Sequence, residues 1–308
     1  MDVSVLIVSF NTRELTLACL ESVYAQTQDV EFEVIVVDNA STDGSAAAVE
    51  EGFSAVRLLA LSENRGFAAA TNLAAEHARG EFLLLLNPDT VVLVGAVQQL
   101  VRFAREQGGR GVFGGRTLYP DGSLNHASCW GRITLWSTLC EASGLSSLLR
   151  RSRWLDPESL GSWRRDEVRD VDIVSGCLML IDHGSWRELG GFDPAFFMYG
   201  EDADLCLRAA ARGLPVRIDP RSLVVHYGGA SERVPAEKLV RLLDARRRLV
   251  RRHFGPWKAR LGVFLMGLRP ATRALTWRIL ALLGRPGAEE RARSWAEVRS
   301  RVRGSGSA

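Results

Sequence analysis

Carboxylates stand at two places in the sequence that suit chemistry. Four leucines run directly into NPDT, which puts Asp89 at the end of an apolar segment. The segment GEDADL supplies three acids in four residues, namely Glu201, Asp202 and Asp204. A carboxylate beside apolar residues costs free energy unless a helix N-terminus, an arginine or a metal ion pairs with it. Cation binding is therefore one of the three explanations for Asp89.

The acids of GEDADL follow FFMYG, which is unusually aromatic for a surface turn. A helix that starts near Glu201 would favour acids in its first turn through its dipole, and this alone explains them. One acid would suffice for that purpose, however. Aromatic faces beside a carboxylate suit a sugar-binding site and raise the carboxyl pKa by excluding water. The residues themselves leave both interpretations open.

The elements that must position these acids alternate between strand and helix patterns. Alternation of this kind predicts an α/β fold with an open, largely parallel sheet and helices on both faces. Ligands of such sheets bind beyond the carboxyl ends of the strands. The predicted strands include VSVLIVSF, FEVIVVD and EFLLLLN, so Asn11, Asp38 and Asp89 should converge at one rim of the sheet.

Several other polar residues near strand ends have two interpretations each. Asp38 could accept a hydrogen bond from the imide N–H of uracil or thymine, or it could cap the helix that follows. Asn11 could line the same pocket, or it could cap a helix in a capping box with Glu14. The segment NRGFAAATN contains Asn64, Gly66 and Asn72; the glycine would let the backbone approach an anion at a helix start, or mark an ordinary turn.

The C-terminal part of the chain differs in charge from the rest. Residues 241–308 hold seventeen Lys/Arg and four Asp/Glu, whereas the whole chain carries only +3. Arginines interrupt the apolar residues there, so no 18-residue apolar run could span a membrane. Basic amphipathic helices on an anionic membrane surface fit the pattern, and the alternatives are a helical hairpin packed on the domain or a contact in a homodimer. The interleaved hydrophobic residues argue against nucleic acid as the partner.

Some classes of protein are disfavoured by composition and motif. The five cysteines form no CxxC pair and no cluster with histidine, which argues against zinc and disulfides and fits a reducing cytoplasm. The N-terminus shows no basic region or cleavage site of a signal peptide. A dinucleotide-binding dehydrogenase would need GxGxxG after the first strand, where this chain has SFNTRE.

The order and spacing of five segments carry a resemblance to a known family. These segments are VSFN, VVDNASTDGS, ENRGFAAATN, LLLLNPDT and GGFDPAFFMYGEDADLCLRA. Together they resemble the family 2 glycosyltransferases with the GT-A fold, and within that family the rhamnosyltransferase-like enzymes that add single sugars in cell-surface polysaccharide synthesis. The expected domains are a GT-A domain over residues 1–235, a basic helical tail over residues 236–303, and a disordered end over residues 304–308.

The resemblance implies roles for particular residues. NPDT occupies the place of the DxD motif, with Asn87 in place of the first acid, so Asp89 would bind Mg²⁺ or Mn²⁺ together with the diphosphate of the donor. The alternative for NPDT is an Asx-type turn. His226 would complete the metal site or serve as a structural group. Asp202 would be the general base, and Glu201 would orient it or bind the acceptor.

The function that the resemblance implies is inverting, metal-dependent hexosyl transfer. Asp38, with Asn11, Asn64, Gly66, Asn72 and Asn87, would bind the nucleotide-sugar donor. The donor would be dTDP-rhamnose or else a UDP-sugar, and the acceptor a lipid-linked or cell-surface glycan. The enzyme would lie in the cytoplasm, peripherally on the inner face of the cell membrane. A catalytically silent GT-A scaffold that binds a sugar nucleotide or a partner enzyme is the alternative.

Overall fold

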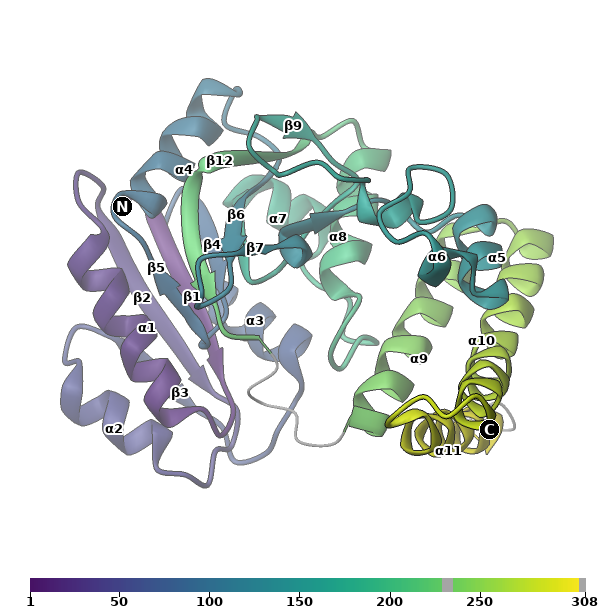
Figure 1. The fold of residues 1–308 in the computed structure, drawn as a ribbon. Coiled ribbons are helices and arrows are strands. Elements are labelled where there is room, and N and C mark those ends of the chain that lie inside the picture. Colours follow the sequence, from purple (N-terminus) through teal and green to yellow (C-terminus); the bar gives the residue numbers. More distant parts are fainter. Residues whose placement is uncertain (229–234, 305–308) are drawn as a thin grey trace. The chain divides into compact units, whose positions relative to one another are not determined.

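The computed structural model describes residues 1–228 and 235–304. The chain forms two compact units, and each is assembled from two separate stretches (Figure 1). Unit 1 comprises residues 1–130 and 164–231, and unit 2 comprises residues 131–163 and 232–308. Unit 2 thus joins residues 131–163 to the C-terminal helices.

Unit 1 is built on a mixed sheet with the strand order β3-β2-β1-β4-β11-β6-β12-β5, to which β7 and β9 add at β6 and β12. The strands from β3 to β4 are parallel, and β11 runs antiparallel between β4 and β6. The bounds of the strands are β1 (Val3–Ser9), β2 (Phe32–Asp38), β3 (Arg57–Ala60), β4 (Phe82–Leu86), β5 (Thr90–Val92), β6 (Val112–Leu118), β7 (Leu124–Asn125), β9 (Arg169–Asp170), β11 (Leu178–Asp182) and β12 (Val216–His226). A separate short pair joins β8 (Cys129–Trp130) and β10 (Ile173–Val174).

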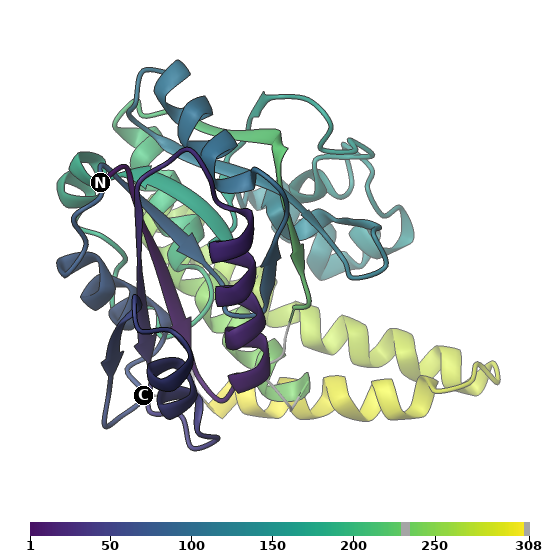
Figure 2. The ribbon, with the colours of Figure 1, turned by 90° about the vertical axis from the view of Figure 1, so that its left-hand side faces the viewer.

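The helices of unit 1 cover both faces of this sheet, which confirms the predicted α/β architecture. Figure 2 shows α1 and α3 on opposite sides of the strands. The helices are α1 (Arg13–Gln26), α2 (Ser45–Gly52), α3 (Phe67–Glu76), α4 (Ala96–Glu106), α7 (His183–Leu189) and α8 (Glu201–Ala211), with a short 3₁₀ turn η1 (His126–Ser128). In α4 the buried residues recur at three- and four-residue spacing, which turns one stripe of the helix toward the core.

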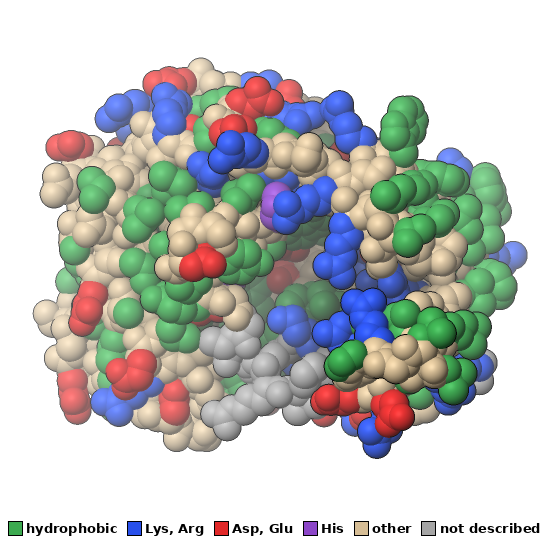
Figure 3. Space-filling model, in the orientation of Figure 1, with side chains coloured by type: hydrophobic (Ala, Val, Ile, Leu, Met, Phe, Trp, Pro, Cys, Tyr) green, Lys and Arg blue, Asp and Glu red, His purple; other side chains and the backbone are tan. Residues whose placement is uncertain are grey.

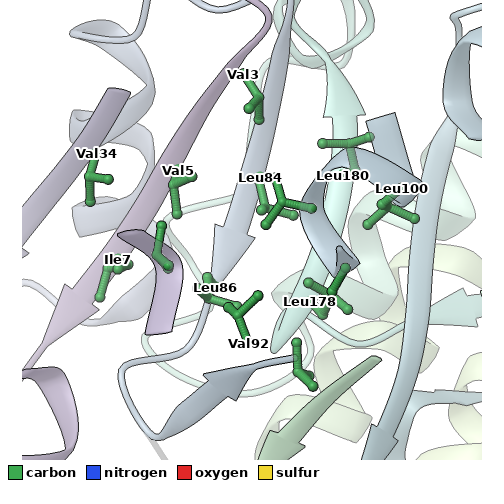
Figure 4. Packing of buried hydrophobic residues seen from close by; sticks show 14 of the residues in the cluster. Val3, Val5, Ile7, Val34, Leu84, Leu86, Val92, Leu100, Leu178 and Leu180 are labelled. Atoms are coloured by element: carbon green, nitrogen blue, oxygen red, sulfur yellow. The ribbon is translucent and has the colours of Figure 1, made fainter. Parts of the chain in front are cut away.

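The buried core of unit 1 explains why its strands are almost continuously apolar. All seven residues of β1 and all five of β4 are buried, because helices cover both faces of these central strands. Figure 4 shows side chains from β1, β4 and β11 meeting in one cluster. Asn11 lies just beyond the end of β1, and Asn87 and Asp89 lie just beyond the end of β4, where the apolar core stops.

The predicted capping box of Asn11 and Glu14 is wrong. Helix α1 begins at Arg13, its N-cap residue Thr12 makes no side-chain capping bond, and the Arg13 N–H donates instead to Asp43 Oδ2 at 2.9 Å. Asn11 has a left-handed backbone with φ 53°. Its Oδ1 instead accepts from the backbone N–H of Thr42 at 2.8 Å, so it ties the loop after β1 to the loop after β2.

Unit 2 is helical in its described residues. It contains α5 (Leu135–Ser143), α6 (Leu145–Leu148), a 3₁₀ turn η2 (Pro157–Ser159), α9 (Pro235–His253), α10 (Pro256–Leu282) and α11 (Ala288–Gly304). Arg246 on α9 binds both carboxylate oxygens of Glu158, at 2.7 and 2.9 Å. It also donates to Glu141 on α5 at 3.2 Å, and Arg269 on α10 pairs with the same carboxylate at 3.3 Å. Part of the basic charge of the tail is thus neutralised inside this unit.

No helix in the described part of the chain has both the length and the apolar character needed to cross a membrane. The expected disorder of residues 304–308 falls outside the described residues, apart from Gly304, which ends α11.

Candidate functional site

Asp89 and His226 meet at the end of the sheet. Strand β5 pairs with β12 so that Thr90 lies opposite His226, and the backbone N–H of Tyr227 donates to the carbonyl of Asp89 at 3.0 Å. This register brings Asp89 Oδ1 to 3.2 Å from His226 Nε2. The two side chains are largely buried, and Asn87 Nδ2 lies 3.4 Å from the same imidazole nitrogen. The structure therefore brings together the two residues that were expected at the metal and Asn87, which was expected to bind the donor.

The donor atoms of this pair fit a divalent cation that is shared with a substrate. Magnesium and manganese take oxygen and imidazole ligands and often use only one or two protein side chains, with phosphate and water completing the shell. The described residues contain no group of three or more His, Cys, Asp or Glu that could hold a metal on their own. Asp89 and His226 would therefore supply a minority of the ligands, and a diphosphate would have to supply others.

The segment 175–177, which precedes β11, links the NPDT turn to the acids of α8. The Asn87 N–H donates to the carbonyl of Cys177 at 3.3 Å, and the Gly176 N–H donates to Asp202 Oδ2 at 3.2 Å. Burial raises the pKa of the Cys177 thiol to about 12, and the charges of Asp89 and Asp202 both add to the rise. The two acidic groups thus both lie next to one short segment.

Glu201 and Asp202 begin α8 in different surroundings. Gly200, with φ 88°, precedes the helix, and Tyr199 before it also has a left-handed backbone, with φ 72°. Asp202 is half-buried, and its two oxygens accept from the backbone N–H groups of Gly176 and Ala203. Glu201 is 6% exposed, and its Oε2 has no hydrogen-bond partner.

These surroundings separate the roles of the two carboxyl groups. Burial raises the pKa of both, and the nearby charge of Asp202 raises the pKa of Glu201 further, to well above its usual range. Two backbone N–H groups favour the ionised form of Asp202, whereas Glu201 has an unpartnered oxygen. A single proton on the pair therefore resides on Glu201, and Asp202 is the carboxylate that can accept a proton.

Replacing Glu201 by glutamine should stabilise the free protein at neutral pH by about 1 kcal/mol, because a buried group then no longer has to hold a proton or a charge. The pKa of Glu201 is raised in the folded protein, whereas in the unfolded chain it has the ordinary value of 4.5. As pH rises above 4.5, Glu201 therefore ionises more readily in the unfolded chain, and this lowers the stability of the wild-type protein. The gain should accordingly disappear below pH 4.5. Thermal unfolding of both proteins across this range measures it. The matched control is Glu21→Gln on the exposed side of α1, which should leave stability unchanged. A Glu201→Gln protein that is less stable at neutral pH would contradict the assignment.

Asp38 lies at the carboxyl end of β2 with an oxygen free for a ligand. The residue is 3% exposed, and its Oδ1 accepts from the backbone N–H of Ser41 at 2.9 Å. Its buried Oδ2 has no hydrogen-bond partner. A buried carboxylate oxygen without a donor is costly, and an imide N–H of a pyrimidine base would satisfy it.

Asn39, which follows Asp38 directly, joins this strand end to the loop before α3. Its Nδ2 donates to Asn64 Oδ1 at 3.0 Å and to the carbonyl of Gly66 at 3.3 Å, and its Oδ1 accepts from the Arg65 N–H at 2.9 Å. Asn64 Oδ1 also accepts from the Gly66 N–H at 2.9 Å. Asn39 was not among the predicted site residues, and the only signal in the sequence was a second polar side chain directly after Asp38.

Gly66 lies against the chain that precedes α8. With φ 81° it adopts a backbone that favours glycine, and a Cβ there would approach the carbonyl oxygen of Phe197 to 2.4 Å. The Phe67 N–H donates to this carbonyl at 2.8 Å. The glycine therefore permits a close approach of backbone to backbone, and the start of α3 is tied to the segment that leads into Glu201.

Asn72 performs a similar connection one turn further along α3. Its Nδ2 donates to the Phe192 carbonyl at 2.8 Å, and its Oδ1 accepts from the Phe192 N–H at 2.9 Å. Both ends of the amide are thus occupied by one backbone unit. In the structure Asn72 holds the segment before α8 in place, and Asn11 holds two loops together at the ends of β1 and β2.

Comparisons with known proteins agree on the kind of protein. Residues 4–149 match the family model described as "Glycosyl transferase family 2". The chain is 31% identical over 242 residues to the O-antigen biosynthesis protein RfbC of Myxococcus xanthus. The aligned region covers 75% of this chain but only 18% of that protein. It is 28% identical over 251 residues to an N-acetylglucosaminyl-diphospho-decaprenol L-rhamnosyltransferase of Mycobacterium tuberculosis, covering 76% of this chain and 80% of that enzyme.

A solved structure supports the fold. The mannosyltransferase PcManGT from Pyrobaculum calidifontis, in complex with GDP-Man and Mn²⁺, superimposes with a TM-score of 0.58. The match covers 96% of this chain and 84% of that protein, at 21% sequence identity. The GT-A architecture that the resemblance implied is confirmed by this likeness.

Proposed function

Because this chain carries a family 2 glycosyltransferase domain, we propose that it transfers a single sugar from a nucleoside diphosphate donor to a hydroxyl group with inversion. The donor proposed is dTDP-rhamnose, with a UDP-sugar as the alternative. Similarity to an enzyme named as a rhamnosyltransferase supports rhamnose. The observation that carries the proposal is the segment 175–177, which hydrogen-bonds both to the NPDT turn that holds the Asp89–His226 pair and to Asp202.

The reaction proposed is a single displacement. Asp202 accepts the proton of the acceptor hydroxyl, whose oxygen forms a bond to the anomeric carbon. The bond from that carbon to the diphosphate oxygen breaks, and its electron pair leaves with the nucleoside diphosphate. Glu201, which keeps its proton, leaves Asp202 as the base and could donate a hydrogen bond to the acceptor.

Asp89 and His226, with Asn87 beside them, would hold Mg²⁺ or Mn²⁺ at the donor diphosphate. The bound cation supplies electrostatic stabilisation of the negative charge that develops on the leaving group. The chain itself fixes the two ligands through the β5–β12 register and the Tyr227–Asp89 backbone bond.

The base of the donor would bind at Asp38, whose free Oδ2 suits the imide N–H that thymine and uracil share. Asn39 and Asn64 shape the loop beside it, and Asn11 and Asn72 support the surrounding segments. Gly66 admits the backbone of Phe197 to the same edge. These residues bind or position the donor, and none of them is assigned a chemical step.

We place the acceptor on a lipid-linked or cell-surface glycan at the inner face of the cell membrane. The relatives named for O-antigen biosynthesis and for a decaprenol-linked substrate support this class of acceptor. Unit 1 would perform the transfer, and unit 2 would bring it to the membrane surface.

Thermal unfolding of the purified protein with dTDP, UDP and GDP, each with and without Mn²⁺, tests the donor site. We expect a pyrimidine nucleotide to raise the unfolding temperature only with Mn²⁺, and a concentration 100 times the Kd would stabilise the protein by about 2.7 kcal/mol. GDP is the control, since its base presents a different pattern of donors. The absence of stabilisation by either pyrimidine nucleotide would refute the donor site.

A further inference from the structure

Helix α10 has an unusual distribution of side chains for a helix of a globular protein. Its buried residues are mostly small: Ala259, Gly262, Met266, Pro270 and Ala274. Seven of its large apolar residues are instead exposed. An amphipathic helix ordinarily turns its large apolar side chains toward the core. The outward apolar face of α10 therefore needs another explanation.

Seven exposed large apolar residues share one side of this helix, and we call this set of residues the outer seam. At 3.6 residues per turn they fall within an arc of about 60° and extend over about 38 Å. Their exposed fractions range from 39% to 88%. The members of the outer seam are Trp257, Leu261, Phe264, Leu268, Leu275, Ile279 and Leu282.

The seam is outward because the opposite side of α10 is already occupied. Within unit 2, α10 packs against α5, α9 and α11, and Figure 2 shows α10 and α11 side by side. A Cβ at Gly262 would come within 2.9 Å of Val250 on α9, so small residues let these helices approach closely. Thr272 Oγ1 donates to the Ala142 carbonyl of α5 at 2.7 Å. Turning the seam inward would disrupt these contacts.

Apolar exposure is concentrated in this unit. Fourteen of the twenty exposed large hydrophobic residues in the described parts of the chain belong to unit 2, although unit 2 is the smaller unit. Figure 3 shows hydrophobic side chains gathered over α5, α6 and α10. Trp154 and Leu148 are 81% and 78% exposed. Contiguous exposure of this extent marks an interaction surface.

The charges around the seam are of one sign. Residues 256–282, which form α10, contain five Lys/Arg and no Asp or Glu, and only Arg269 among the five pairs with an acid in the described part of unit 2, Glu141. Lys258, Arg260 and Arg278 on α10 are exposed and, by the helical repeat, flank the seam on its two sides. An apolar stripe with basic flanks and no acid is the composition that lies in the interface of a lipid bilayer with anionic headgroups.

We propose that the outer seam of α10 is the surface by which this protein binds an anionic lipid bilayer, with the helix lying in the plane of the headgroups. The apolar side chains enter the acyl boundary, and Lys258, Arg260 and Arg278 contact the headgroup phosphates. The inference deepens the membrane association in the proposed function by naming its surface, and it does not depend on the sugar or the base of the donor.

A second copy of the chain suits the seam less well. Two α10 helices packed along their seams would bring basic flanks together with no acid on either helix to pair with them, and like charges in such positions repel. An anionic lipid surface offers both the apolar phase and the opposite charge.

The test is sedimentation of the full-length protein with vesicles of phosphatidylcholine alone and of phosphatidylcholine mixed with phosphatidylglycerol. We expect binding to the mixed vesicles that weakens with added salt, and a loss of about tenfold or more in Leu275→Ser/Ile279→Ser. The matched control, Val94→Ser/Val168→Ser, replaces two exposed apolar residues of unit 1 and should bind like the wild type. Thermal unfolding establishes that both variants are folded.

The outcomes separate this inference from the proposed function. Unchanged vesicle binding in Leu275→Ser/Ile279→Ser would overturn the proposal for the outer seam. The proposal would also be overturned if the wild type formed a dimer that does not bind vesicles and if this variant were a monomer. Stabilisation by nucleotide with Mn²⁺ should be the same in the seam variant and the wild type. If that stabilisation is absent from both while vesicle binding depends on the seam, the proposed donor site fails and the seam stands.

Discussion

Asp202→Asn is expected to lower the rate of sugar transfer by about 10²–10⁴-fold, the usual contribution of a positioned general base. The asparagine oxygen can still accept from one of the two backbone N–H groups, that of Gly176 or that of Ala203, so the start of α8 should keep its shape with the loss of one hydrogen bond. Stabilisation by nucleotide and Mn²⁺ should therefore remain. Transfer is measured as release of the nucleoside diphosphate with acceptor present.

The pH profile gives this prediction a second readout. Burial raises the pKa of Asp202 above its ordinary value of 3.8, and a base works only when it is ionised. Transfer by the wild type should therefore fall as pH is lowered through that raised pKa, and the residual activity of Asp202→Asn should lack this acidic limb. Asp121→Asn, at an exposed turn between β6 and β7, is the matched control. Full activity in Asp202→Asn would refute the base assignment.

Asp89→Ala is expected to reduce transfer by about 10²–10³-fold and to abolish the dependence of nucleotide binding on Mn²⁺. Asp89 supplies the carboxylate of the Asp89–His226 pair, and its Oδ1 lies 3.2 Å from His226 Nε2. Without this carboxylate, a single imidazole would hold the cation poorly. His226→Ala should weaken the same dependence to a smaller extent. Thermal unfolding with nucleotide across a range of Mn²⁺ concentrations measures both effects.

An alternative explanation of the same contact is a plain ion pair between Asp89 and a protonated His226. In that case both variants would lose stability in the absence of any cation, and the response to Mn²⁺ would be the same as in the wild type. His77→Ala at the end of α3 is the control for loss of an imidazole away from the site. An unchanged Mn²⁺ response in Asp89→Ala would place the cation elsewhere.

The sequence was sufficient for the residues at strand ends. Long apolar segments such as the one before Asn87 predict buried strands, and polar residues at their carboxyl ends must share a rim when the strands are parallel. Asp38 and Asp89 were located by this argument. Asp202 depended in addition on the family resemblance, because acids at a helix start have a sufficient structural explanation.

The sequence was insufficient for contacts between distant segments. Asn72 pairs with the backbone of Phe192, 120 residues away, and Gly66 lies against Phe197. Neither partner can be recognised from the sequence, because the contacts are to backbone groups, which are the same at every residue. The unpartnered Oδ2 of Asp38 and Oε2 of Glu201 are likewise visible only once neighbouring atoms are in place.

Charge counting also reached a limit in unit 2. The excess of arginine distinguishes the tail in the sequence, but it did not show that Arg246 and Arg269 face Glu158 and Glu141. Burial opposes ionisation of Glu158, yet the charge of Arg246 holds the pKa of this carboxyl below its usual range. Total charge cannot distinguish an arginine that pairs with an acid inside the protein from one that is exposed and can contact a binding partner.

The two-part construction of unit 2 has a consequence for synthesis on the ribosome. Glu141 emerges 105 residues before Arg246, which it contacts, and the strands β11 and β12 of the other unit are made in between. At about 5–20 residues per second, the segment that forms α5 and α6 waits roughly 5–20 s for its helical partners. The nascent chain therefore completes its sheet first, and a chaperone has its longest opportunity to bind at residues 131–163.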